Sequence, residues 1–143
     1  LGVEVERTIM LSDWTNQTFI PKWNRKTESH RERAVRTAKK YLTRSVGGEC
    51  IETVGDAVYA ADCNIDGVVH IGPFNCIPEI VSQCILPNVS KQENIPVISL
   101  LMDEQTGKAG VVTRIEAFVD LIRRQRKNKL YCNSERVLCA SSR

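Results

Sequence analysis

Hydrophobic positions along the chain alternate between the pattern of buried strands and the pattern of amphipathic helices. Apolar or β-branched runs of strand length cover residues 3–11, 66–72 and 96–102. Apolar residues recur with the spacing of a helix face at residues 30–46, 51–63, 78–86 and 113–127. Strands that alternate with helices predict a parallel sheet with right-handed crossovers. We therefore expect an α/β fold, with an open, mostly parallel sheet and flanking helices, flavodoxin-like or Rossmann-like.

The boundaries of these elements follow from local signals. Gly47 and Gly48 end the first predicted helix, and Pro87 interrupts or restarts the third. Thr113 begins the last predicted helix as its capping residue, with Glu116 completing a capping box. We expect residues 12–29 to form an irregular loop. Residues 1–129 are predicted as a single α/β domain and residues 130–143 as a C-terminal tail.

Length and composition limit the classes of protein that the sequence fits. A chain of 143 residues with 42% hydrophobic and 26% charged residues suits one globular domain and excludes a disordered or collagen-like protein. Its apolar runs are far shorter than the ~20 residues of a membrane-spanning helix, so no membrane partner is expected. The absence of a charged-then-apolar leader argues against secretion. The start at Leu1 without Met suggests a piece of a longer protein.

The formal charge of +3 is unevenly distributed. Residues 21–44 carry nine basic against two acidic residues, residues 45–113 two against nine, and residues 114–129 six against two. The basic clusters fall on predicted helices and lack interleaved aromatic residues, so we interpret them as solvated helix faces. Nucleic-acid binding remains the weaker alternative.

The six cysteines do not form a recognisable metal or disulfide pattern. Cys76 is the best candidate for chemistry, because Pro78 suits a first helical turn and places Cys76 at or next to the N-cap. A thiol there is prepared to act as a nucleophile or metal ligand, although it could also be a small buried residue. Cys50, before a helix, is a distant second candidate. Of the others, we expect Cys63 and Cys84 to be packing residues.

Two loops leave the predicted carboxyl edge of the sheet, where ligands of open α/β sheets bind. Residues 72–79 carry Cys76, and residues 103–110 open with Asp103 and Glu104. Either acid could act in acid–base chemistry, orient a partner, or cap and solvate the loop. Arg114 lies in the predicted first helical turn, where the helix dipole disfavours a cation, which suggests a role in binding or in an ion pair.

The sequence lacks the common nucleotide-binding motifs, and three further candidate residues are expected to have no chemical role. The sequence contains neither the Gly-x-Gly-x-x-Gly fingerprint of a dinucleotide site nor a Walker A loop. His70 lies in the middle of a predicted strand, and we expect a core residue rather than a ligand. Cys132 and Cys139 lie in the tail and are expected to be free thiols.

The segments DGVVHIGPFNCIPEIVSQCILP and IPVISLLMDEQTGKAGVVTRIEAFVDL carry two motifs, Pro-Phe-x-Cys-x-Pro-Glu and Asp-Glu…Thr-Arg-x-Glu-Ala-Phe. Together they resemble the C-terminal domain of acyl-CoA dehydratase activase-related proteins. These proteins are in turn similar to the cluster-bearing subunits of 2-hydroxyacyl-CoA dehydratases and benzoyl-CoA reductases. The resemblance covers residues 47–125 well and the first 46 residues loosely.

The resemblance implies a cytoplasmic domain of an iron–sulfur electron-transfer protein from an anaerobic prokaryote. Cys76 matches a cysteine that helps to hold a [4Fe–4S] cluster, while Asp103, Glu104, Thr113 and Arg114 would line the same edge as cofactor-binding residues. The companion cysteines and the ATP-hydrolysing domain of the family are absent from this chain, so we expect neither a stable cluster nor catalysis from it alone. The implied partners are upstream domains of the parent chain and a CoA-thioester dehydratase or reductase.

Two alternatives remain open. The same loop edge could belong to a cofactor-free binding or assembly module that docks a partner domain. It could also bind a flavin or a CoA moiety. The acidic middle segment disfavours a phosphate-rich ligand, unless Lys108 and Arg114 converge on it.

Overall fold

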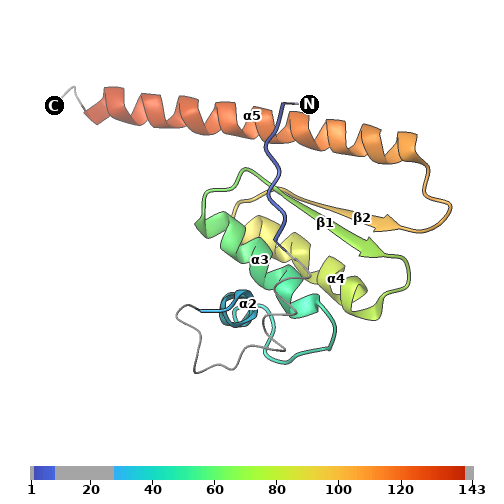
Figure 1. The fold of residues 1–143 in the computed structure, drawn as a ribbon. Coiled ribbons are helices and arrows are strands. Elements are labelled where there is room, and N and C mark those ends of the chain that lie inside the picture. The colour runs from blue at the N-terminus through green and yellow to red at the C-terminus, as the bar shows by residue number, and fades with distance from the viewer. Residues whose placement is uncertain (1, 9–27, 141–143) are drawn as a thin grey trace. The chain divides into compact units, whose positions relative to one another are not determined.

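The computed structural model describes residues 2–8 and 28–140, with side chains as far as residue 128. Its elements are α2 (His30–Ala38), α3 (Cys50–Asp62), β1 (Val68–Pro73), α4 (Ile77–Gln92), β2 (Val97–Met102) and α5 (Lys108–Ala140) (Figure 1). The chain divides into two compact units, one spanning Glu4–Asp103 and the other containing α5. The described residues therefore form a mixed α/β structure.

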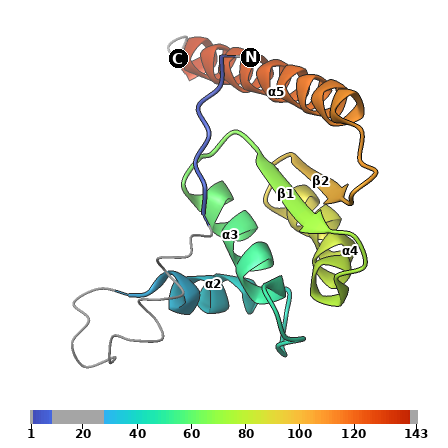
Figure 2. The ribbon, with the colours of Figure 1, turned by 45° about the vertical axis from the view of Figure 1, so that its right-hand side comes forward.

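The centre of the first unit is a strand–helix–strand motif. β1 and β2 pair in parallel, in register from Val68 with Val97 to Pro73 with Met102. The Phe74 N–H donates to the Met102 carbonyl at 2.9 Å, so hydrogen bonding to β2 continues one residue past the end of β1. The predicted parallel sheet is confirmed, but within the described residues it has two strands. Figure 2 shows α3 and α4 on the same side of these strands.

The apolar core lies between α2, α3, α4 and the sheet. Its buried members are Ala38, Val54, Ala57, Val58, Leu86 and Val89. The predicted apolar faces of α2 and α3 pack here, through Ala38, Val54 and Val58. The face predicted for α4 is wrong, because that helix packs through Leu86 and Val89 while Ile80 is exposed.

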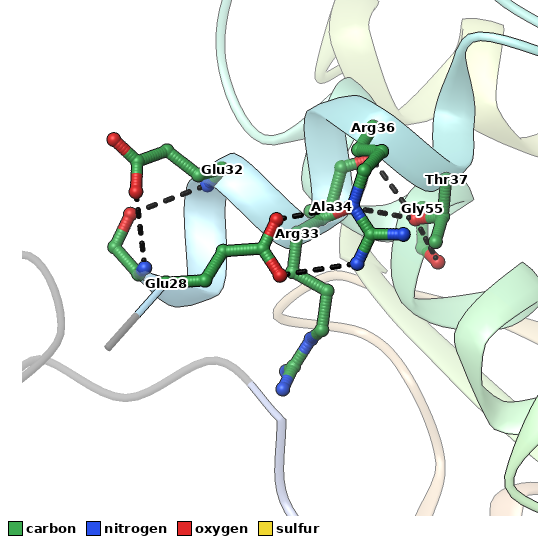
Figure 3. A network of polar contacts seen from close by, with 8 residues as sticks. Glu28, Glu32, Arg33, Ala34, Arg36, Thr37 and Gly55 are labelled. Carbon is green, nitrogen blue, oxygen red and sulfur yellow. Dashed lines mark hydrogen bonds and ion pairs between the residues drawn. The ribbon is translucent and has the colours of Figure 1, made fainter.

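Small residues let α2 and α3 approach closely. A Cβ atom at Gly55 would lie 2.2 Å from the Ala34 carbonyl oxygen. The Thr37 hydroxyl donates to the Gly55 carbonyl at 2.9 Å (Figure 3). The two backbones thus meet at a point where only glycine fits.

α2 is shorter than predicted, ending at Ala38 rather than near residue 46. The backbone N–H groups of Tyr41 and Leu42 both donate to the Ala38 carbonyl, at 2.9 and 2.8 Å. This tight turn directs both side chains onto the core without further helix, which is why their helical spacing was misleading.

The end of α3 before Asn64 is confirmed. Asn64 adopts a left-handed conformation with φ 57°, and the Ile65 N–H donates to the Ala60 carbonyl at 3.0 Å. These are the features of a Schellman motif, in which asparagine replaces the usual glycine.

α4 continues through Pro87 to Gln92, so the predicted end near residue 86 is wrong. Proline removes one helical hydrogen bond and costs about 3 kcal/mol in a helix interior. Leu86 and Val89, on either side of it, are 1% and 0% exposed. Burial of this face outweighs the local cost of the proline.

α5 begins at Lys108, five residues before the predicted start. The Thr113 hydroxyl donates to the Ala109 carbonyl at 3.0 Å, which is a bond within a helix and not a cap. The predicted capping box is therefore wrong, and Arg114 lies beyond the first turn. Helix also replaces the predicted tail as far as Ala140.

The strand predicted over residues 3–11 is not formed at residues 3–8. Residues 9–11, and the predicted loop up to residue 27, lie outside the described residues. Within the described part of the chain, no helix combines the length and apolar character needed to cross a membrane.

Candidate functional site

Cys76 is the N-cap residue of α4, as the position of Pro78 predicted. Its backbone is extended, at φ −77° and ψ 109°, and its carbonyl accepts the Ile80 N–H at 2.9 Å. The Cys76 side chain makes no capping hydrogen bond, is half-buried and is not in a disulfide. The first N–H groups of a helix lack intrahelical partners and favour an anion. The thiol therefore occupies a position that suits a thiolate ligand.

The loop that presents Cys76 lies at the carboxyl end of the sheet. Asn75 turns the chain with a left-handed φ of 61°, and the Cys76 N–H donates to the Pro73 carbonyl at 3.4 Å. The hydrogen bond between Phe74 and Met102 joins this loop to the end of β2, where the exposed Asp103 follows. The prediction that both loops leave one edge of the sheet is confirmed.

The remaining predicted site residues belong to the other compact unit. Glu104 precedes α5, and Thr113 and Arg114 lie in its second turn, all three exposed. Whether they share a ligand with Cys76 and Asp103 stays a prediction.

A buried hydrogen-bond chain, which the sequence did not predict, lies behind the Cys76 loop. His70 Nε2 is 2.6 Å from Glu79 Oε2, and His70 Nδ1 is 3.1 Å from Ser99 Oγ. The Thr53 hydroxyl donates to Glu79 Oε2 at 3.4 Å. His70 and Glu79 are 5% and 6% exposed. The chain joins β1, α4, β2 and α3, with His70 as the hydrogen-bonded core residue that the sequence indicated.

The Ser99, His70 and Glu79 set has the composition of a hydrolase triad but not its arrangement. In such triads the serine contacts Nε2 and the carboxylate contacts Nδ1, the reverse of the pairing here. Ser99 also lies in the middle of β2, paired with His70 on the face covered by α4. With this reversed pairing, His70 Nε2 faces Glu79 and not the Ser99 hydroxyl, so we interpret the chain as structural.

Cys50, the second candidate, is the first residue of α3 and is fully buried. Burial raises the pKa of its thiol above the ordinary range, and the nearby Glu79 and Glu52 carboxylates add to this, while a hydrogen bond with Ser82 opposes it. A thiol held in the neutral form is a poor nucleophile and a poor metal ligand. Cys50 is therefore a packing residue.

The prediction that Cys63 and Cys84 pack in the core is wrong, because both are exposed. Cys84 lies on the solvent face of α4, and Cys63 follows the last turn of α3. The side chains of Cys132 and Cys139 lie outside the described residues. Among the residues that the structure describes, no group of three or more His, Cys, Asp and Glu side chains is placed to hold a metal ion. Cys76 is thus at most one ligand of a shared site.

A second polar cluster, also missed from the sequence, joins α2 to α3. His30 Nε2 lies 2.9 Å from Asp56 Oδ2, and Arg31 lies 3.3 Å from Glu52. Both carboxylates are buried, and burial raises the pKa of Asp56 while His30 opposes the rise. The cluster joins two buried carboxyl groups of α3 to side chains of α2, which is a structural role.

The comparisons with known proteins give no relative for this arrangement: no protein-family model, curated protein or solved structure matches the chain. The resemblance to acyl-CoA dehydratase activase-related proteins accordingly stays a prediction.

Proposed function

We propose that this chain is a domain of a CoA-substrate-specific enzyme activase or 2-hydroxyacyl-CoA dehydratase-like iron–sulfur electron-transfer protein, to which it contributes one cluster ligand, Cys76. The observation that carries the proposal is the position of Cys76 at the N-cap of α4, at the carboxyl edge of a parallel sheet. Ligands of α/β sheets bind at that edge, and the helix N-terminus favours an anionic thiolate.

The donor set fits one ligand position of a [4Fe–4S] cluster and not a complete site, since cysteine thiolates normally supply all four. The other ligands would come from other parts of the protein or from a partner. When bound, such a cluster supplies one-electron transfer, here toward a CoA-thioester dehydratase or reductase in the cytoplasm of an anaerobic prokaryote. In the same proposal the sheet belongs to a larger flavodoxin-like one, and Asp103, Glu104, Thr113 and Arg114 line its edge.

The test is anaerobic reconstitution with iron and sulfide of the protein in its natural assembly, with Cys76→Ser against Cys84→Ser. Cys84 is a matched control because it lies exposed on the same helix, two turns further on. We expect Cys76→Ser to lower the iron content and the visible absorption, and Cys84→Ser to leave both unchanged. Equal iron content and equal spectra in the two variants would remove Cys76 as a ligand.

A cofactor-free assembly module is the second candidate, and the surface beside Cys76 favours it. Phe74, Ile77 and Ile80 flank the thiol and are 59%, 73% and 42% exposed. Exposed apolar side chains that gather around one loop are typical of a docking surface. Under this function, Ile77→Asp releases the partner domain in a co-purification assay while Cys76→Ser leaves the iron content of the assembly unchanged. A lost iron signal with intact association favours the cluster instead.

A further inference from the structure

The first turn of α4 is built differently from that of α2, although both carry glutamate at the third helical position. In α2 the Glu32 carboxylate accepts the backbone N–H of its own N-cap residue, Ser29, at 3.1 Å. In α4 the Glu79 carboxylate instead lies 2.6 Å from His70 on β1. Glu79 is thus diverted from the local cap that its position would allow to a partner nine residues earlier.

This diverted contact is buried and polar where an apolar pair would also fill the space. A buried charged or polar pair must overcome the loss of hydration, so burial by itself does not explain why His70 and Glu79 are there. Both are anchored a second time, His70 by Ser99 of β2 and Glu79 by Thr53 of α3. A buried hydrogen-bond network of this kind favours one arrangement of the elements that it joins.

Within this network, the contact between His70 and Glu79 joins β1 and α4, the two elements that flank the Cys76 loop. His70 stands six residues before Cys76 and Glu79 three residues after it, so their hydrogen bond closes the loop at its base. Gly72 allows the closure, because a Cβ atom there would lie 3.1 Å from Glu79 Cβ and 3.5 Å from His70 Nε2. This buried contact therefore closes the base of the loop, in addition to the backbone hydrogen bond from Phe74 to Met102.

We infer that His70 and Glu79 are positioning residues that hold the Cys76 loop in its present form. The consequence for iron binding rests on the proposed function, but the positioning of the thiol does not. Without the contact, the first turn of α4 opens locally and the thiol becomes more accessible, while the core below it stays closed.

The test measures the alkylation of individual cysteines by iodoacetamide, resolved by peptide mass spectrometry, in the full chain. Three thiols serve as reporters: Cys76 for the loop, the exposed Cys84 for intrinsic reactivity on the same helix, and the buried Cys50 for unfolding. The measured quantity is the ratio of the Cys76 rate to the Cys84 rate, at a temperature where Cys50 remains protected.

We expect Glu79→Ala to raise this ratio by roughly threefold or more, because the loop opens locally. Glu79→Gln, which keeps a hydrogen-bond acceptor for His70, restores it. If Cys50 becomes alkylated in Glu79→Ala, the protein has unfolded and Gly72→Ala is used instead. Its added methyl group displaces the Glu79 side chain rather than removing it. Val89→Ala is the matched control, since it destabilises the same helix at a fully buried site away from the loop.

An unchanged ratio in both Glu79→Ala and Gly72→Ala would overturn the inference, as would an equal rise in Val89→Ala. A raised ratio in a protein whose iron content does not depend on Cys76 would retain the positioning role and reject the cluster.

Discussion

Gly55 sets the distance between α2 and α3, and no other residue could stand there without moving a helix. Its missing Cβ would meet the Ala34 carbonyl oxygen at 2.2 Å, and the Thr37 hydroxyl donates to its carbonyl. Side chains that overfill a packed contact force backbone shifts, which commonly cost about 1–3 kcal/mol. The polar pairs His30–Asp56 and Arg31–Glu52 lie across the same helix contact.

Gly55→Ala should therefore lower the free energy of unfolding by about 2–3 kcal/mol, measured by urea denaturation followed by circular dichroism. Gly110→Ala is the control, because a Cβ there meets nothing within 4 Å and the residue lies in α5. That exchange stabilises a helix interior by about 0.5–1 kcal/mol, and in the first turn of α5 we expect a stabilisation no larger than this. Equal effects of the two substitutions would contradict the close contact of α2 with α3.

At the scale of single residues, the sequence predicted those features that a short stretch of chain determines by itself. Pro78 predicted Cys76 at or next to an N-cap, and it is the N-cap residue, because that relation is fixed within three residues. The partner of Glu79 was not predictable, because a Pro-Glu pair at a helix start indicates a local cap, and the contact with His70 depends on how β1 and α4 pack.

The elements show the same division between local and packing effects. Asn64 ended α3 as predicted because a left-handed cap is a local conformation. Pro87 did not end α4, because the buried residues on either side of it pack against other helices and this packing stabilises the helix through the proline. Thr113 was misread as a cap because its hydroxyl binds equally well to the carbonyl four residues earlier.

The end of α4 is tied to the segment after α2 by one carboxylate. Glu93, the C-cap residue, accepts hydrogen bonds from Lys40 Nζ and Tyr41 Oη, each at 2.6 Å. The Lys40 and Tyr41 hydrogen bonds hold the pKa of Glu93 below its usual range. A carboxyl group whose pKa is lower in the folded than in the unfolded protein binds fewer protons in the folded state. It therefore stabilises the fold above its unfolded-state pKa, and this stabilisation is lost as pH falls through its folded-state pKa.

Tyr41→Phe should lower the free energy of unfolding at pH 7 by about 1 kcal/mol, because it removes one hydrogen bond to a charged group. The difference between the variant and the wild type should shrink as pH falls from about 5 to 3, as Glu93 becomes protonated. Urea denaturation at a series of pH values measures this difference. A difference that is constant with pH would show that Tyr41 stabilises through packing alone.

For the whole molecule, apolar periodicity predicted the class of structure but not its extent. The two predicted strands pair in parallel as expected, because α4 forms the crossover between them. Their expected burial is only partial, since Val69 and Ile71 of β1 are exposed. The β-branched residues 3–8 form no strand, since a strand needs a partner edge that composition does not reveal. The candidate site is likewise partial, because the described residues place one suitable thiol at the sheet edge and no set of three metal ligands.

The central claim is that Cys76 binds iron in the intact protein, and electron paramagnetic resonance of the reduced protein, purified without oxygen, tests it most directly. The Cys84→Ser protein should give the wild-type cluster signal, whereas Cys76→Ser should lose the signal or shift its g values, because one thiolate ligand is replaced. Identical spectra from the two variants would contradict the claim and leave the loop edge as a docking surface.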